Sequence, residues 1–210
     1  MVRILLVDDH AVVRKGIRSI LEDGLMGAQI MEAGSGDEGL AILGTQSFDA
    51  VVLDLSMPGR SGIDLLSEIK HRWAKLPVLI MSLHPEEHFA VRALRAGAAG
   101  YLTKAAAPEA LIEAVQKVTR GSKYLSEAIA DRLASELGKD APASVPHEKL
   151  SDREFEVMRG IAAGESVSEI AARMHLSVKT VSTYRTRLLE KMHMTTNAEL
   201  TRYAIQNGLV

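Results

Sequence analysis

The sequence contains no cysteine and no long apolar run. Without cysteine in 210 residues, disulfide frameworks, thiolate metal sites such as zinc ribbons, and cysteine nucleophiles are excluded. The first apolar run, Ile4–Val7, is four residues long and precedes two aspartates, which is too short for a signal peptide or a membrane span. These absences predict a cytoplasmic protein that makes no membrane contact.

An excess of charge of one sign is also lacking. The 25 lysines and arginines nearly balance the 27 aspartates and glutamates, giving a formal net charge of -2. The whole-chain charge therefore gives no indication of a nucleic-acid partner, and any DNA contact must be local. A chain of this length can form one large domain or two of ordinary size.

The first part of the chain alternates short apolar runs with segments of helical periodicity. Such an alternation predicts a parallel sheet covered by helices on both faces, because the strands that are apolar throughout must be buried on both sides. The expected strands are 4–7, 29–33, 50–53, 78–81 and 100–102, and the expected helices are 11–23, 36–46, 63–72, 85–96 and 108–120.

The second part of the chain has no strand signal. Residues 125–137 could form one more helix, and the segment after it is small, polar and contains two prolines, as in a linker. Two capping boxes, Ser151 with Glu154 and Ser166 with Glu169, then begin helices, and Ser177 and Asn197 precede two more. The predicted domains are 1–121 and 148–210, joined by a linker over 122–147, and the four helices are 151–163, 167–174, 178–192 and 197–207.

Polar residues follow four of the five predicted strands of the first domain. Ligands of open parallel α/β sheets bind outside the carboxyl ends of the strands, so these residues should meet at one edge. Three carboxylates there repel one another unless a hard cation lies among them, and Mg²⁺ accepts carboxylates while leaving positions for a phosphate. The residues are Asp8, Asp9, Asp54, Ser82 and Lys104.

We expect Asp54, at the centre, to be a nucleophile that forms an acyl phosphate. Lys104 and the Ser82 hydroxyl would contact the other phosphoryl oxygens. Each residue alone has a plainer interpretation: Asp8 and Asp9 could be helix caps, Asp54 could open a turn, and Ser82 and Lys104 could simply be solvated. Only their joint placement after successive strands favours a phosphoryl site.

Four motifs resemble the receiver domain of two-component response regulators, which is a doubly wound, flavodoxin-like α/β fold with a five-stranded parallel sheet. They are Asp8-Asp9-His10, Leu53-Asp54-Leu55-Ser56-Met57-Pro58-Gly59, Ile80-Met81-Ser82 and Gly100-Tyr101-Leu102-Thr103-Lys104. The resemblance implies that Asp54 is the phosphoacceptor, and that Mg²⁺ is held by Asp8, Asp9, Asp54 and the backbone carbonyl of Ser56. It also implies switch roles for Ser82 and Tyr101 and phosphoryl contact by Lys104. Ala105 stands where many receivers have proline, so a cis peptide bond is not expected there.

The third helix of the second domain is basic on one side. Val181, Tyr184 and Leu188 form an apolar stripe, whereas the other side carries hydroxyl groups and cations, as a helix in the major groove of DNA does. The plainer interpretation is the solvated face of an amphipathic helix. The expected DNA contacts are Lys179, Thr180, Ser182, Thr183, Thr186 and Arg187.

The second domain resembles the LuxR-type helix-turn-helix. The matching motifs are Leu150 to Met158, Glu169-Ile170-Ala171 and Leu176 to Val181, although Val167-Ser168 replaces the Asn-Lys pair of many members. A receiver followed by this small all-α domain of four helices resembles the NarL/FixJ subfamily. The resemblance implies that the last helix pairs two subunits, through Asn197, Leu200, Tyr203 and Ala204.

Together these features predict a DNA-binding transcriptional regulator controlled by phosphorylation. Its partners would be a sensor histidine kinase, promoter DNA and, once phosphorylated, a second copy of the chain. It would not be an enzyme apart from Mg²⁺-dependent phosphorylation and dephosphorylation of its own aspartate. Two alternatives remain: a phosphatase of the haloacid dehalogenase type, which would need an aspartate where Ser56 stands, and a regulator whose helical tail binds a protein.

Overall fold

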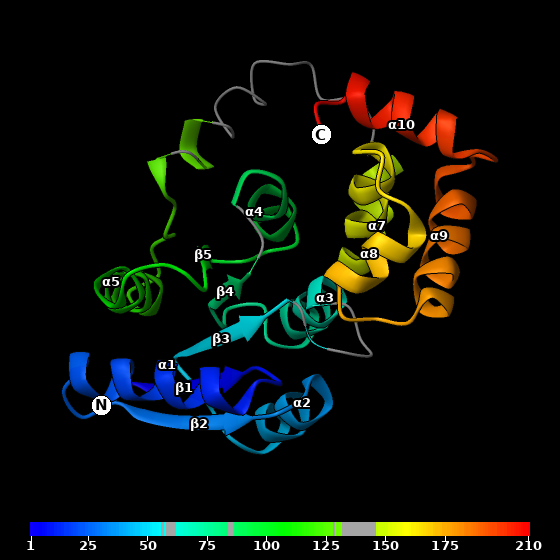
Figure 1. The fold of residues 1–210 in the computed structure, drawn as a ribbon. Coiled ribbons are helices and arrows are strands. Elements are labelled where there is room, and N and C mark those ends of the chain that lie inside the picture. The colour runs from blue at the N-terminus through cyan, green and yellow to red at the C-terminus, as the bar shows by residue number, and fades with distance from the viewer. Residues whose placement is uncertain (56, 58–61, 84–85, 128, 132–145) are drawn as a thin grey trace. The chain divides into compact units, whose positions relative to one another are not determined.

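A computed structural model describes residues 1–55, 57, 62–83, 86–127, 129–131 and 146–210 of the chain (Figure 1). The chain divides into two compact units, Met1–Ala141 and Pro142–Val210. The helix predicted over 125–137 lies partly outside the described residues; of its positions, 127 and 129–131 are helical. The domain boundaries at residues 121 and 148 and the linker between them remain a prediction.

The first unit is built on a five-stranded sheet in which every strand pair is parallel. The strand order is β2-β1-β3-β4-β5, and the order reverses beside β1 and β3. This is the predicted α/β fold, and the strand bounds agree with the predicted ones to within one residue. The strands are β1 (Arg3–Val7), β2 (Gln29–Ala33), β3 (Ala50–Asp54), β4 (Val78–Ser82) and β5 (Gly100–Thr103).

Helices cover both faces of this sheet because successive strand residues point to opposite sides. One face packs against α1 (Ala11–Gly24) and α5 (Pro108–Thr119) in a core that includes Ile4, Leu6 and Val52. The other face is covered by α2, α3 and α4, where α2 lies so close to β1 that a Cβ on Gly39 would come within 3.1 Å of Val7. Their bounds are α2 Gly36–Thr45, α3 Gly62–Arg72 and α4 Glu86–Arg95.

The chain returns to the sheet after α5. Tyr124 forms an isolated parallel bridge with Gly100, and its backbone N–H donates to the carbonyl of Ala99 at 2.9 Å. A Cβ at Gly100 would lie 2.8 Å from the Tyr124 carbonyl oxygen, so only glycine allows this close approach. The segment that leaves the first unit is thereby attached to the edge strand β5.

The described part of the second unit, residues 146–210, contains a short 3₁₀ helix, η1 (Pro146–Lys149), and four α-helices (Figure 1). The two predicted capping boxes are present, at Ser151 with Glu154 and at Ser166 with Glu169. The fourth helix also starts with a capping box, formed by Thr196 and Glu199, so its cap is Thr196 and Asn197 is the first helical residue. The α-helices are α7 (Asp152–Ala162), α8 (Val167–Arg173), α9 (Val178–Met192) and α10 (Asn197–Gln206).

Candidate functional site

Three of the predicted site residues meet at the carboxyl edge of the sheet. Asp54 ends β3 and Asp8 directly follows β1, its neighbour in the sheet, so the two carboxylates lie side by side. The Lys104 ammonium bridges them, with Nζ 2.6 Å from Asp8 Oδ2 and 2.7 Å from Asp54 Oδ2. Both aspartates are 1% exposed and the lysine side chain is 5% exposed. A buried Asp–Lys–Asp cluster therefore occupies the predicted position.

The charges of this edge are not balanced by the lysine alone. Asp9 lies beside the cluster with a side chain that is 25% exposed. Three carboxylates and one ammonium carry a net charge of about -2, and an oxygen from each of the three aspartates lies within 4.8 Å of the others. Oxygen donors at this spacing suit a hard divalent cation. The residues present thus fit the Mg²⁺ that the resemblance implies.

Local structure holds the Asp8-Asp9 segment in place. The His10 backbone N–H donates to Asp8 Oδ1 at 2.7 Å, and the Arg14 guanidinium donates to the Asp8 carbonyl oxygen at 2.6 Å. Arg14 is itself fixed by Glu32 on β2, at 3.2 Å. Neither Arg14 nor His10 was among the predicted site residues, although His10 stands directly after the aspartate pair.

The two predicted switch residues are buried, and they lie on neighbouring strands of the sheet. Ser82 ends β4 and Tyr101 lies in β5, and both are 0% exposed. The backbone N–H of Lys104 donates to the Ser82 carbonyl at 2.7 Å, which joins the ends of the two strands. The described peptide bonds include no cis bond.

The loop after Asp54 is only partly described. Ser56, whose carbonyl was predicted to be a metal ligand, lies outside the described residues. Beyond the loop, α3 begins very close to the strand end: a Cβ at Gly62 would lie 2.5 Å from the Cα of Leu55. Glycine is therefore required where α3 approaches the residue that follows Asp54.

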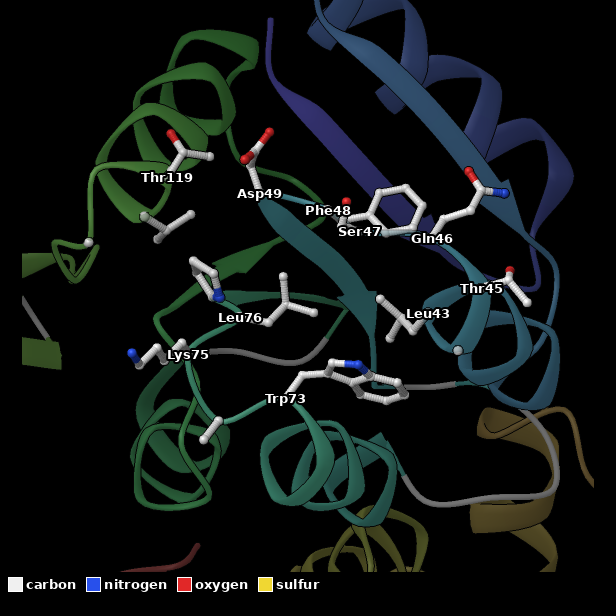
Figure 2. Close-up of a pocket in the computed structure, with 15 residues that line it drawn as sticks. Leu43, Thr45, Gln46, Ser47, Phe48, Asp49, Trp73, Lys75, Leu76 and Thr119 are labelled. Carbon is white, nitrogen blue, oxygen red and sulfur yellow. The ribbon is translucent and has the colours of Figure 1, made fainter.

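A separate surface pocket of about 910 Å³ lies at the opposite, amino edge of the sheet (Figure 2). Trp73, Leu76 and Leu43 line it, together with Asp49, which directly precedes β3. The carboxyl ends of β3 and β4 carry Asp54 and Ser82, so the length of the sheet separates this pocket from the acidic cluster. Trp73 is the only tryptophan of the chain.

In the second unit, α9 has the two faces that its sequence predicts. Val181 and Leu188 are fully buried and Met192 nearly so, whereas the opposite side is exposed. Five of the six predicted DNA contacts are exposed and Thr180 is partly buried. The Thr180 side chain lies 2.8 Å from the capping hydroxyl of Ser177 at the start of the helix. The exposed residues are Lys179, Ser182, Thr183, Thr186 and Arg187.

Several basic residues near α9 are engaged within the unit. Arg173 pairs with Glu165 at 3.0 Å, Lys191 with Glu154 at 2.7 Å, and Arg185 donates to Asn197 Oδ1 at 2.8 Å. Lys179 and Arg187 have no ion-pair partner within the described part of the chain. Lys179 and Arg187, and also Arg185 because its partner is a neutral amide, therefore keep positive charge that an external ligand can meet.

The four residues predicted for the dimer contact lie on α10, and the structure shows how far each is exposed. Leu200 and Ala204 are both 0% exposed because they face the interior of the unit, where α10 packs against α7. Tyr203 is half-buried, and its hydroxyl lies 2.8 Å from His147 Nδ1. The large apolar side chain that α10 does present to solvent is Ile205, at 62% exposure.

Two family descriptions match the chain and divide it as the folds do. "Response regulator receiver domain" matches residues 4–116, and "Bacterial regulatory proteins, luxR family" matches residues 148–204. The chain belongs to the response regulators. This response regulator combines a receiver with a LuxR-type DNA-binding domain and is a transcriptional regulator of the NarL/FixJ subfamily, so the resemblance read from its motifs is confirmed.

Its relatives include response regulators that match over nearly their full length. Response regulator UvrY of Escherichia coli K12 is 37% identical over 210 residues, which are 100% of this chain and 96% of the relative. Response regulator GacA of Pseudomonas aeruginosa PAO1 is 35% identical over 211 residues, covering 100% of this chain and 98% of GacA. Transcriptional activator protein ExaE of Pseudomonas putida is 38% identical over 208 residues, covering 99% of this chain and 97% of ExaE.

Solved structures agree with the fold. The RcsB response regulator of Salmonella typhimurium superposes with a TM-score of 0.59 at 26% identity, covering 96% of this chain and 97% of RcsB. A LuxR-family response regulator from Aurantimonas sp. SI85-9A1 superposes with a TM-score of 0.61 at 34% identity, covering 66% of this chain and 99% of the Aurantimonas chain. Among the described helices of this regulator, none has the length and hydropathy of a membrane span.

Proposed function

We propose that transfer of a phosphoryl group to Asp54 controls DNA binding by α9. The observation that carries this proposal is the buried cluster in which Lys104 bridges Asp8 and Asp54 at 2.6 and 2.7 Å. Asp54 is the one carboxylate of the three that lies at the end of a central strand. A phosphohistidine of a sensor histidine kinase would supply the phosphoryl group, as the membership in this family implies.

The chemistry at Asp54 is a substitution at phosphorus. A carboxylate oxygen of Asp54 attacks the phosphorus atom, the bond to the donor nitrogen breaks, and an acyl phosphate forms. Asp8, Asp9 and Asp54 would hold Mg²⁺, with the Ser56 carbonyl as a further ligand. The ion would neutralise charge on the phosphoryl oxygens. Lys104 already lies in hydrogen-bonding distance of Asp54 and can donate to a phosphoryl oxygen from the same position.

The signal would leave the site through Ser82 and Tyr101. A phosphoryl group on Asp54 adds acceptor oxygens next to the end of β4, and the Ser82 hydroxyl is the neighbouring donor that can respond. Movement of Ser82 frees space beside β4, and Tyr101 on β5 would rotate into it. Both side chains are 0% exposed here, so such a rearrangement must alter packing at the β4–β5 edge.

The DNA-binding surface would be the exposed side of α9. Lys179 and Arg187 supply phosphate contacts and Ser182, Thr183 and Thr186 lie between them on the same side of the helix. RcsB, which is similar to this chain, has been solved bound to promoter DNA in the presence of the phosphomimetic BeF3⁻, and as two dimers on two parallel DNAs. We propose that this chain also binds DNA as a dimer, with the exposed face of α10, including Ile205, as the subunit contact.

Replacement of Asp54 by Asn tests the phosphoacceptor. The full chain is incubated with a small radiolabelled phosphodonor and Mg²⁺, and we expect labelling of the native chain but not of Asp54→Asn. Asp23→Asn, which changes an exposed aspartate on α1, is the matched control and should be labelled normally. Undiminished labelling of Asp54→Asn would overturn the assignment. Rapid hydrolysis of phosphate esters by the native chain would favour a phosphatase instead.

Alanine substitutions on α9 test the DNA-binding surface. Lys179→Ala should weaken binding to all duplexes alike and lower the slope of log K against log salt by about 1, because one phosphate contact is lost. Thr183→Ala or Thr186→Ala should instead change the preferred sequence. Selection of bound duplexes from a random pool, with and without phosphodonor, measures both. A chain that binds no duplex at low salt would favour a protein partner for the helical domain.

A further inference from the structure

His10 lies against the acidic cluster, and neither the resemblance nor the family assigns it a role there. Its Nδ1 atom is 2.9 Å from Asp9 Oδ1 and 3.4 Å from Asp8 Oδ1. One donor atom from each of Asp8, Asp9, His10 and Asp54 lies within 4.8 Å of all the others. Donors around a four-coordinate ion at about 2.1 Å are about 3.4 Å apart, so side-chain shifts of up to about 1 Å would bring these four donors around a single ion.

Helix capping does not explain the position of His10. It is the N-cap residue of α1, but its side chain makes no capping hydrogen bond, and the imidazole is directed instead to the two aspartates. The side chain is 54% exposed, so an ion from solvent can reach it. Asp8 and Asp54, in contrast, are buried beneath it and shared with Lys104. The cluster therefore has an accessible nitrogen donor above its oxygen donors.

The nitrogen donor changes which cations the site prefers. Mg²⁺ takes oxygen ligands and keeps several waters, so an imidazole adds little to its binding. Zn²⁺ and other late first-row divalent ions accept imidazole nitrogen together with carboxylate oxygen, and they bind mixed sites of this kind more tightly. A set of three carboxylates and one imidazole matches the four-coordinate preference of Zn²⁺.

We propose that His10 is a ligand for late first-row divalent ions, and that it makes the acidic site bind Zn²⁺ in competition with Mg²⁺. This inference rests on the proposed function of the cluster as a divalent-cation site. Zn²⁺ held by the aspartates and His10 uses Asp54 as a ligand and fills the coordination positions that a phosphoryl oxygen needs. Zn²⁺ bound in this way therefore opposes phosphorylation of Asp54.

The experiment compares His10→Ala with His71→Ala in the full chain. His71 is an exposed histidine in the last turn of α3 and is the matched control. Co²⁺ serves as a spectroscopic substitute for Zn²⁺: its visible absorption during titration reports nitrogen ligation, and competition with Zn²⁺ gives the Zn²⁺ affinity. Mg²⁺ affinity is measured separately by calorimetry, and the fluorescence of Trp73 verifies that each variant is folded.

We expect His10→Ala to lose at least about tenfold in Co²⁺ and Zn²⁺ affinity, since the loss of even an outer-shell partner of a metal ligand costs that much. Its Mg²⁺ affinity should stay within about twofold of that of the native chain, and His71→Ala should change neither. Unchanged Zn²⁺ affinity in His10→Ala, or an equal loss for Mg²⁺ and Zn²⁺, would overturn the inference while leaving the phosphoacceptor proposal intact. If the native chain binds no Mg²⁺ and Asp54 is not labelled, the proposed function itself fails.

Discussion

Replacement of Lys104 by Met should destabilise the receiver far more than removal of an ordinary surface lysine. The Lys104 ammonium is the positive charge that bridges Asp8 and Asp54, both of which are 1% exposed. Met preserves most of the side-chain volume, so the change removes charge more than packing. Two buried carboxylates are then left next to each other without their cation, and the loss of one partner of a buried ion pair costs about 3 to 5 kcal/mol.

Trp73 allows this effect to be measured in the full chain. It is the only tryptophan and lies in the receiver, so its fluorescence follows receiver unfolding and not that of the DNA-binding domain (Figure 2). With a urea slope of about 2 kcal/mol per molar, the expected loss lowers the midpoint by about 1.5 to 2.5 M. Lys15→Met, at an exposed position of α1, should change the free energy of unfolding by less than about 0.5 kcal/mol.

Two further measurements separate charge from other causes. Adding Asp54→Asn to Lys104→Met removes one of the unpaired carboxylates and should recover part of the lost stability. Mg²⁺ at about a hundredfold above its dissociation constant should add about 2.7 kcal/mol to the free energy of unfolding of the receiver, because it binds only the folded cluster. A midpoint for Lys104→Met within about 0.5 M of the native chain, or no recovery in the double variant, would refute the electrostatic reasoning.

Three predictions concern the DNA-binding domain, and each can be measured by thermal unfolding followed with circular dichroism, where about 1 kcal/mol corresponds to about 4 to 8 °C. His193 follows α9 in the left-handed conformation at φ 54°, so His193→Gly should stabilise the domain by about 1 kcal/mol. Gly164 has φ 88°, so Gly164→Ala should destabilise the domain by a similar amount. Equal effects of the two substitutions would contradict this reasoning. Burial raises the pKa of Glu156 above its ordinary 4.5. The contribution of this group to stability is therefore greatest below pH 4.5 and falls as the pH rises through the raised pKa. Glu156→Gln should remove that part of the pH dependence, and an unchanged pH profile of stability would argue against it. Tyr203→Phe removes the 2.8 Å contact with His147 and should lower the free energy of unfolding by about 1 kcal/mol. A decrease below about 0.3 kcal/mol would mean that the hydrogen bond contributes nothing to stability.

The sequence was sufficient to predict the acidic edge because a general property of parallel sheets locates it. Residues that follow β1, β3, β4 and β5 must lie at the same edge, whatever the details of packing, and Asp8, Asp54 and Lys104 do so. The helix starts were equally predictable, since capping boxes depend on residues three positions apart. Local patterns of this kind require no knowledge of the tertiary structure.

Features that depend on side-chain direction could not be predicted. The apolar residues of α10 have the spacing of a packed face, but periodicity does not say whether that face packs on the same subunit or on another. Leu200 and Ala204 pack on their own subunit. Likewise, the pairing of Lys191 with Glu154 joins residues 37 positions apart, so a count of basic residues overestimates the charge free to meet DNA.

The bridge between Tyr124 and Gly100 has a mechanical consequence. Tyr124 belongs to the segment through which the chain departs from the receiver, and its hydrogen bond to Ala99 fastens that segment beside Tyr101. A displacement of this strand would therefore be carried over to the segment that follows α5.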